Sequence, residues 1–231
     1  MSNDLLTSMR RVAAKMNELA LDHVFLGGSV LRFLLDTPEL TPIRQTRDVD
    51  VAIGVVAFEA YPALEARLRQ AGFDHDMREG APKCRWIFEE TIVDIMPAGG
   101  EYLGLNTTWF REAVDTAKTI QIGDAMLRIV EPAAFLATKL EAFNDRGDSD
   151  YLASHDLEDV ITVVDGRRHI VEDVRLAPRE LRGFVVSEFS RLLGKRRFQD
   201  AIAAHLPPDE ASQRRAPIVL TRLQAIAAIC L

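Results

Sequence analysis

Two aspartates separated by one residue, Asp48 and Asp50, begin the apolar segment Asp48-Val49-Asp50-Val51-Ala52-Ile53. In a β-strand these two side chains point to the same face, because strand side chains alternate with a period of two. Like charges held side by side repel each other unless a cation lies between them. The pair is therefore predicted to bind a hard divalent metal ion, Mg²⁺ or Mn²⁺, through carboxylate oxygens.

A glycine-rich turn, Gly27-Gly28-Ser29, follows the short apolar run 24–26 and precedes a helix-like segment that extends to Leu35. Glycines let the backbone approach a ligand closely, and the helix directs its N-terminal N–H groups towards an anion. We therefore expect Gly27, Gly28 and Ser29 to bind phosphate. Arg47, directly before the aspartates, either clamps a phosphate or pairs with a nearby acid.

The order Gly-Gly-Ser, a gap, then Asp-x-Asp between apolar residues resembles the nucleotidyltransferase (polymerase-beta-like) superfamily. The resemblance implies that Ser29 lies in the phosphate-binding turn and that Asp48 and Asp50 bind catalytic magnesium. Superfamily members usually carry a third carboxylate on a later strand, and Asp94, within the β-branched run 91–96, supplies one. A charged residue in such a run is costly to bury unless it pairs or coordinates. Asp94 is accordingly expected to help hold a second ion and to deprotonate the attacking hydroxyl.

A lysine and an aspartate further along the chain extend the predicted site. On a helical wheel Lys139 falls between Phe135 and Phe143, on the apolar arc, where a lysine either snorkels to the rim or meets an anion such as a triphosphate. Asp156 falls at the border of the next helix's apolar face, so it either serves the site or forms an ordinary interhelical ion pair. Asp159 falls nearer the opposite side, and we expect it to be solvated.

The segments 137–142 and 155–159 narrow the resemblance to AbiEii-type nucleotidyltransferases, which are related to the MenT toxins and the type IV toxin–antitoxin toxins. The resemblance covers about residues 20–166. It implies an NTP substrate, an RNA acceptor such as a tRNA 3′ end, a cognate antitoxin, a nucleotide-contacting Lys139 and a catalytic or positioning Asp156. The family commonly has Gly-Gly-Thr-Ala-Leu where this chain has Gly27-Gly28-Ser29-Val30-Leu31. Two alternatives to an RNA-modifying enzyme are a nucleotidyltransferase with a small-molecule acceptor and a non-catalytic nucleotide-binding module of the same fold.

The pattern of apolar residues predicts strands followed by helices, and so an α+β fold. The resemblance implies that the strands form a nucleotidyltransferase-type mixed sheet flanked by helices, followed by a helical bundle. We expect a core domain at 1–130 and a helical domain at 131–231 that completes the active-site cleft. Strands are predicted at 22–26, 48–53, 84–89, 91–96, 118–122 and 126–130, and helices at 4–20, 29–35, 58–70, 106–115, 132–143, 151–165, 168–176, 178–194, 197–205 and 216–229.

The composition is that of a globular protein with a substantial core: 231 residues, 48% hydrophobic and 27% charged. Two cysteines far apart in sequence suggest free thiols in a reducing compartment, and the charged, amphipathic N-terminus is neither a signal peptide nor a membrane span. We therefore expect a cytoplasmic protein without a membrane partner. Because the net charge is −7, an RNA partner would need a local basic patch. The clusters available, which we interpret as solvated helix ends, are 167–168, 195–197 and 214–215.

Overall fold

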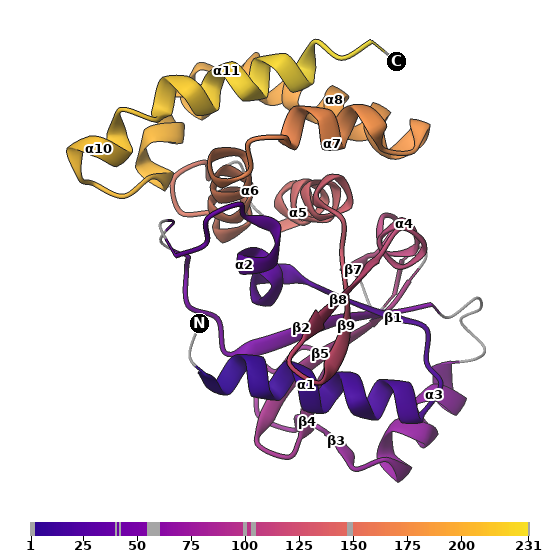
Figure 1. Cartoon of the computed structure of the whole chain (residues 1–231). Coiled ribbons are helices and arrows are strands. Elements are labelled where there is room, and N and C mark those ends of the chain that lie inside the picture. Colours follow the sequence, from indigo (N-terminus) through magenta and orange to yellow (C-terminus); the bar gives the residue numbers. More distant parts are fainter. Residues whose placement is uncertain are drawn as a thin grey trace. The chain divides into compact units, whose positions relative to one another are not determined.

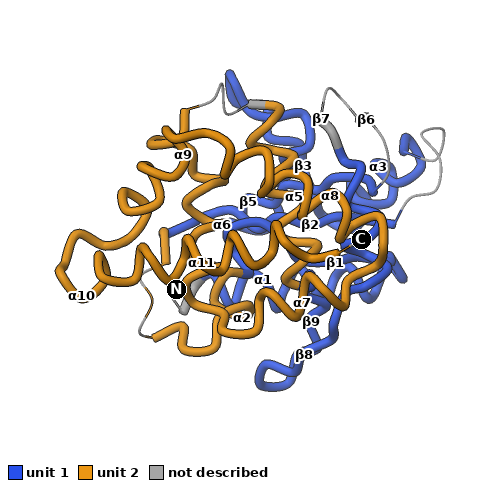
Figure 2. The backbone as a smooth tube through the Cα atoms, turned by 90° about the horizontal axis from the view of Figure 1, so that it is seen from above, with its two compact units in different colours: residues 1–30, 45–131 blue, residues 31–44, 132–231 orange. Residues whose placement is uncertain are grey.

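The chain folds into two compact units that are interleaved in sequence. In the computed structural model, unit 1 comprises residues 1–30 and 45–131, and unit 2 comprises residues 31–44 and 132–231 (Figure 2). The chain thus leaves unit 1 after Val30, returns at Gln45 and leaves it again after Glu131. The residues that the structure describes are 3–39, 41, 43–54, 61–98, 101–102, 105–146 and 150–230.

Unit 1 is built on a mixed seven-stranded sheet with the order β3-β4-β5-β2-β1-β9-β8. The central pairs combine both directions: β2 is antiparallel to β1 and parallel to β5, and β1 is parallel to β9. A second, two-stranded sheet pairs β6 with β7. The strands are β1 (His23–Leu26), β2 (Asp48–Ile53), β3 (Phe73–His75), β4 (Arg85–Phe88), β5 (Thr91–Pro97), β6 (Glu101–Tyr102), β7 (Leu105–Asn106), β8 (Lys118–Ile122) and β9 (Ala125–Ile129).

Helices cover this sheet because each presents an apolar stripe. Helix α1 (Asn3–Glu18) packs on β2 and β9 through side chains spaced four or three apart, and Met9, Val12 and Met16 are fully buried (Figure 1). Helix α3 (Tyr61–Gln70) packs on β3, and α4 (Phe110–Asp115) packs on β1 and β2. The 3₁₀ turn η1 (Gly27–Val30) continues from β1 and is entirely buried.

Unit 2 is helical. Its helices pack mainly through α5 against α6, α7 and α8, and through α11 against α6, α7 and α8. Within the described residues, no helix has both the length and the hydropathy that a membrane span requires. The helices are α2 (Leu31–Leu34), α5 (Pro132–Arg146), α6 (His155–Gly166), α7 (Ile170–Leu176), α8 (Arg179–Leu193), α9 (Arg196–Ala201), η3 (Ile202–His205), α10 (Glu210–Gln213) and α11 (Ala216–Ala227).

The predicted α+β class is confirmed. The strands predicted at 84–89 and 91–96 pair as the hairpin β4–β5, and those predicted at 118–122 and 126–130 pair as the hairpin β8–β9. Strand β3, the β6–β7 pair and helix α10 were not predicted. The helix predicted at 151–165 begins later, at His155, because the Asp150 carboxylate accepts the N–H groups of Leu152 and Ala153 and holds a turn there. Ser154 then caps the helix by accepting the N–H of Leu157. Residues 58–60 of another predicted helix lie outside the described residues.

Candidate functional site

Three predicted carboxylates lie on one face of the unit 1 sheet. Asp50 and Asp94 are direct partners in the parallel β2–β5 pair, and Asp48 precedes Asp50 by two residues on β2. Because strand side chains alternate, all three point to the same side. The side chain of Asp48 is 33% exposed and that of Asp94 is 11% exposed, so this face is partly shielded from water. We refer to Asp48, Asp50 and Asp94 as the carboxylate face.

Arg85 of β4 bridges two members of the carboxylate face. Its Nε and Nη2 donate to the two carboxylate oxygens of Asp94, both at 2.7 Å, and Nη2 also donates to Oδ2 of Asp48 at 3.2 Å. The carboxylates raise the pKa of Arg85 further above its usual value, chiefly through the hydrogen bonds with Asp94, so the guanidinium stays charged. A bidentate, charge-assisted pair of this kind is among the stronger side-chain contacts. Sequence reasoning did not single out Arg85.

The register of the β4–β5 hairpin places Arg85 there. Phe88 pairs with Thr91 across the two-residue connection Glu89-Glu90, and counting back along both strands pairs Arg85 with Asp94. Two-residue hairpin loops require positive φ, which Glu89 adopts at 49°. Hairpin length therefore decides which cation faces Asp94.

The predicted phosphate-binding turn lies against Asp50. Gly27 has φ of +67°, and a Cβ built on it would come within 2.0 Å of Asp50 Oδ2, so only glycine fits beneath this carboxylate. Ser29 is 1% exposed, and its hydroxyl donates to the Leu26 carbonyl at 3.1 Å. That hydroxyl hydrogen thus fastens the turn to the end of β1 and is not directed at a ligand. Gly28 is buried in the same turn.

Thr46 and Arg47, which directly precede β2, differ in their contacts. The Thr46 hydroxyl donates to Oδ1 of Asp48, so Thr46 and Arg85 hold the two oxygens of this carboxylate. Arg47 is exposed, and within the part of the chain that the structure describes no ion pair of Arg47 is found. Both predicted roles of Arg47, binding a phosphate or pairing with a nearby acid, therefore stay open.

The carboxylate face has the hard oxygen donors that Mg²⁺ and Mn²⁺ prefer, and it already holds a cation, the Arg85 guanidinium. As their side chains stand, the described residues contain no cluster of three His, Cys, Asp or Glu side chains close enough to hold one metal ion together. The donor atoms are thus of the type that a divalent ion takes, but with Arg85 in place they are not arranged around one. Arg85 is the group with which such an ion would compete.

The negative charge of Asp94 also acts on the thiol of Cys84. Burial, followed by the charge of Asp94, raises the pKa of Cys84 to about 12, so Cys84 stays protonated at neutral pH. It is therefore no nucleophile. The neighbouring Trp86 is fully buried and belongs to the core.

In unit 2, Lys139 lies in a buried ion cluster. Its ammonium contacts Asp156 Oδ1 at 3.1 Å and Asp159 Oδ2 at 2.6 Å, and Arg44 Nη2 lies 3.6 Å from the same Asp159 oxygen. An interhelical ion pair, one of the two alternatives given for Asp156, is thus present. The prediction that Asp159 is solvated was wrong, because it is 0% exposed. Helix α6 packs against α2, α5, α11 and η3, which leaves it almost no solvated face.

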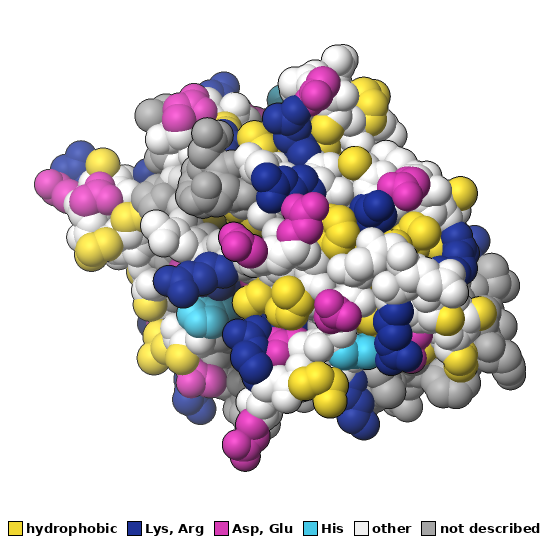
Figure 3. Space-filling view, turned by 90° about the horizontal axis from the view of Figure 1, so that it is seen from below, with side chains coloured by type: hydrophobic (Ala, Val, Ile, Leu, Met, Phe, Trp, Pro, Cys, Tyr) yellow, Lys and Arg dark blue, Asp and Glu magenta, His cyan; other side chains and the backbone are white. Residues whose placement is uncertain are grey.

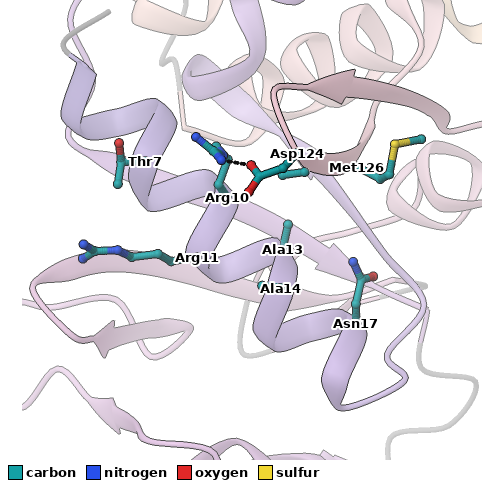
Figure 4. A pocket seen from close by; sticks show the side chains of 9 residues that line it. Thr7, Arg10, Arg11, Ala13, Ala14, Asn17, Asp124 and Met126 are labelled. Carbon is teal, nitrogen blue, oxygen red and sulfur yellow. Dashed lines mark ion pairs between the residues drawn. The ribbon is translucent and has the colours of Figure 1, made fainter.

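A surface pocket of about 580 Å³ lies between α1 and the β8–β9 hairpin of unit 1. Arg10 reaches across it to form an ion pair with Asp124 (Figure 4). None of the predicted site residues lines this pocket. Its walls are formed by Thr7, Arg10, Arg11, Ala13, Ala14, Asn17, Asp124, Ala125 and Met126.

Four of the seven residues in the three basic clusters form ion pairs: Arg167 with Asp173, Arg196 with Asp200, Arg214 with Glu210 and Arg215 with Asp165. On the face of the molecule seen in Figure 3, Lys and Arg side chains are interspersed with Asp and Glu. This face therefore carries no large field of a single sign.

Comparison with solved structures shows where this fold occurs. The chain is similar to the crystal structure of an antigenic nucleotidyltransferase-like protein from Paracoccidioides brasiliensis, with 20% identity and a TM-score of 0.55 over 88% of this chain and 94% of that one. The likeness establishes the fold of a nucleotidyltransferase-like protein. No family model and no curated protein matches the sequence.

Two more distant structural matches are the antibiotic-resistance factor ANT(2'')-Ia and JHP933 from Helicobacter pylori. The first has 16% identity and a TM-score of 0.47 over 84% of this chain and 97% of that one. The second has 13% identity and a TM-score of 0.46 over 98% of this chain and 93% of that one.

Proposed function

We propose that this protein is a nucleotidyltransferase that moves a nucleoside monophosphate from an NTP to an acceptor hydroxyl and releases pyrophosphate. The observation that carries the proposal is the carboxylate face beside the glycine turn: Asp50 and Asp94 are register partners, and Asp50 packs directly on Gly27. The similarity in fold to a nucleotidyltransferase-like protein supports the same activity.

Each residue of this face has a role in the proposal. Asp48 and Asp50 would hold the divalent ion, and Asp94, on the adjacent strand, would accept the proton of the acceptor hydroxyl. Mg²⁺ bound there would polarise phosphoryl oxygens and stabilise the charge that develops on them. Gly27, with no side chain, lets Asp50 pack directly on the turn that is proposed to bind the triphosphate.

The acceptor is proposed to be RNA, and the motif resemblance to AbiEii-type toxins is what favours it. Because the described basic clusters are largely ion-paired, RNA would be recognised at its 3′ end by the shape of the site more than by a broad electrostatic surface. A cognate antitoxin protein and a cytoplasmic location belong to the same proposal.

The test is transfer of label from each α-³²P-NTP in the presence of Mg²⁺, with total RNA or with a panel of hydroxyl-bearing small molecules. Labelled RNA is the expected product. Asp50→Asn should reduce transfer by at least about 10³-fold, because it removes a charged ligand without changing the shape of the side chain. Its thermal unfolding midpoint should stay close to that of the wild type.

The matched control is Asp74→Asn, which makes the same chemical change on an exposed residue of β3, a strand separated from β5 by β4. It should retain wild-type transfer. A labelled small molecule would replace RNA as the acceptor, and NTP binding without any product would identify a non-catalytic module. Full transfer by folded Asp50→Asn would defeat the proposal.

A further inference from the structure

Arg85 occupies the position at which a metal ion would have to meet Asp48 and Asp94. One guanidinium nitrogen, Nη2, lies 2.7 Å from Asp94 Oδ2 and 3.2 Å from Asp48 Oδ2, so it spans two strands as a shared cation would. The contact is partly shielded, since the Arg85 side chain is 22% exposed. Charges that are shielded in this way interact more strongly than surface charges do.

The contacts of Arg85 are unequal. The bond to Asp94 is bidentate, whereas the bond to Asp48 is single and longer. Asp48 is also the more exposed of the two carboxylates, at 33% against 11%. A cation arriving from solvent therefore meets the weaker contact first, and Asp94 keeps Arg85 in place while Asp48 is released.

We propose that Arg85 is an intramolecular competitor for divalent metal: it neutralises Asp48 and Asp94 in the metal-free protein and sets the affinity with which the carboxylate face takes up Mg²⁺ or Mn²⁺. This inference deepens the proposed function, because it names the residue that controls metal entry to that site. It assigns Asp94 a positioning role through Arg85 in addition to any contact with the ion.

The experiment is a Mn²⁺ titration of the nucleotide-free, full-length protein by isothermal titration calorimetry, with bound Mn²⁺ checked by electron paramagnetic resonance. Arg85→Gln should bind Mn²⁺ roughly tenfold or more tightly than the wild type, because the ion no longer displaces a bound cation. Mn²⁺ should also raise the unfolding midpoint of this variant more than that of the wild type.

The control for a general change in charge is Arg78→Gln. Arg78 lies near enough to Arg85 for their charges to interact, but its own partner is Asp76 and its side chain is 66% exposed. Its Mn²⁺ affinity should stay within about twofold of the wild type, since exposed charges are screened. In the double variant Arg85→Gln/Asp48→Asn the gain should disappear, because the freed oxygen of Asp48 is what provides it.

A second variant of Arg85 keeps the inference testable if Arg85→Gln fails to fold. Arg85→Gln leaves the buried Asp94 without its partner, so Arg85→Lys, which keeps the charge but lacks the planar fork, is measured in parallel. A lysine makes fewer simultaneous bonds, and Mn²⁺ affinity should rise by roughly threefold over the wild type. Unchanged or weaker Mn²⁺ binding in folded Arg85→Lys, or in folded Arg85→Gln, overturns the inference.

Label transfer measured on the same preparations separates the two proposals. Tighter Mn²⁺ binding by the Arg85 variants, without transfer by the wild type, would uphold the role of Arg85 and reject the nucleotidyltransferase. Transfer by the wild type with no change in Mn²⁺ affinity would do the opposite. If neither the wild type nor the variants bind Mn²⁺, the inference about Arg85 fails.

Discussion

Gly27 is subject to two constraints that can be separated by experiment. Its backbone has φ of +67°, and its missing side chain leaves the space that Asp50 fills. Gly80 has a similar φ of +80° but nothing within 4 Å of the position where a Cβ would lie. An alanine would therefore be strained in its backbone at either position. Only at Gly27 would its side chain also collide with a residue of the carboxylate face, Asp50.

We therefore predict that Gly27→Ala and Gly80→Ala each lose about 1–2 kcal/mol of unfolding free energy from strain alone, and that Gly27→Ala loses more. Only Gly27→Ala should abolish nucleotidyl transfer, because it displaces Asp50. Urea unfolding and the label-transfer assay measure the two effects. Equal behaviour of the two variants in both assays would show that Asp50 does not depend on this glycine.

The two cysteines are predicted to react very differently. Cys84 is buried with its pKa raised to about 12, whereas Cys230 is exposed. At about pH 8 an aromatic disulfide reagent should modify one thiol per native chain, because the thiolate is the reacting form, and both thiols once the chain is denatured. Rapid modification of Cys84 in the native protein would mean that the β4 region opens readily.

The Cys84 thiol is expected to make the free energy of unfolding depend on pH under alkaline conditions. In the unfolded chain Cys84 loses its proton near its ordinary pKa of 9.0, whereas in the folded chain it keeps the proton until about pH 12. The folded state thus binds more protons in this range, so unfolding free energy should fall as pH rises from 9 towards 12. Cys84→Ala should reduce that slope in urea-unfolding experiments.

At the scale of elements, hairpins and amphipathic helices could be predicted from the sequence because their patterns are local. Both strands of the β4–β5 hairpin were predicted, and counting from the two-residue turn between them would have paired Arg85 with Asp94. The N-cap Ser154, followed by Asp156 in the first turn, was a similar local signal for the start of α6. What could not be predicted was which helix would be buried on all sides, since that depends on non-local packing. Asp159 was misplaced for this reason.

The α5–α6 ion cluster is predicted to matter for stability. Lys139→Met leaves Asp156 and Asp159 buried without their ammonium partner, and breaking a buried pair from one side typically costs about 3–5 kcal/mol. Lys118→Met is the matched control, because Lys118 also pairs with a carboxylate, Glu131 at 2.8 Å, but is 71% exposed. Its cost should be below about 1 kcal/mol.

Urea unfolding measures both lysine variants. Lys139→Met/Asp159→Leu should recover part of the lost unfolding free energy, because it removes a buried charge together with its partner. An equally small cost for both lysine variants would show that water solvates the cluster. Any loss of transfer in a Lys139 variant has to be corrected for this loss of folded protein before it is attributed to nucleotide binding.

At the scale of the whole molecule, the interleaving of the two units limits where the chain can be divided. Residues 31–44 belong to the helical unit although they precede most of the sheet. Their backbone is bonded into it: Asp36 N–H donates to the Gly166 carbonyl at 3.1 Å, and Arg167 Nη1 donates to the Leu34 carbonyl at 3.1 Å. Leu35 packs so closely on Gly166 that a Cβ there would come within 2.8 Å of Leu35 Cδ2.

A fragment of residues 132–231 is therefore predicted to be incompletely folded alone and to fold cooperatively when a peptide of residues 31–44 is added. The peptide restores the partner of Gly166, buries Leu34 and Leu35 again and returns Arg44 to Asp159. Circular dichroism and urea unfolding of the fragment, with and without peptide, measure the effect. A peptide carrying Leu34→Asp and Leu35→Asp should give no stabilisation, because it would bury unpaired charges. Full stability of the fragment without any peptide would show that the helices fold independently of the segment inserted between β1 and β2.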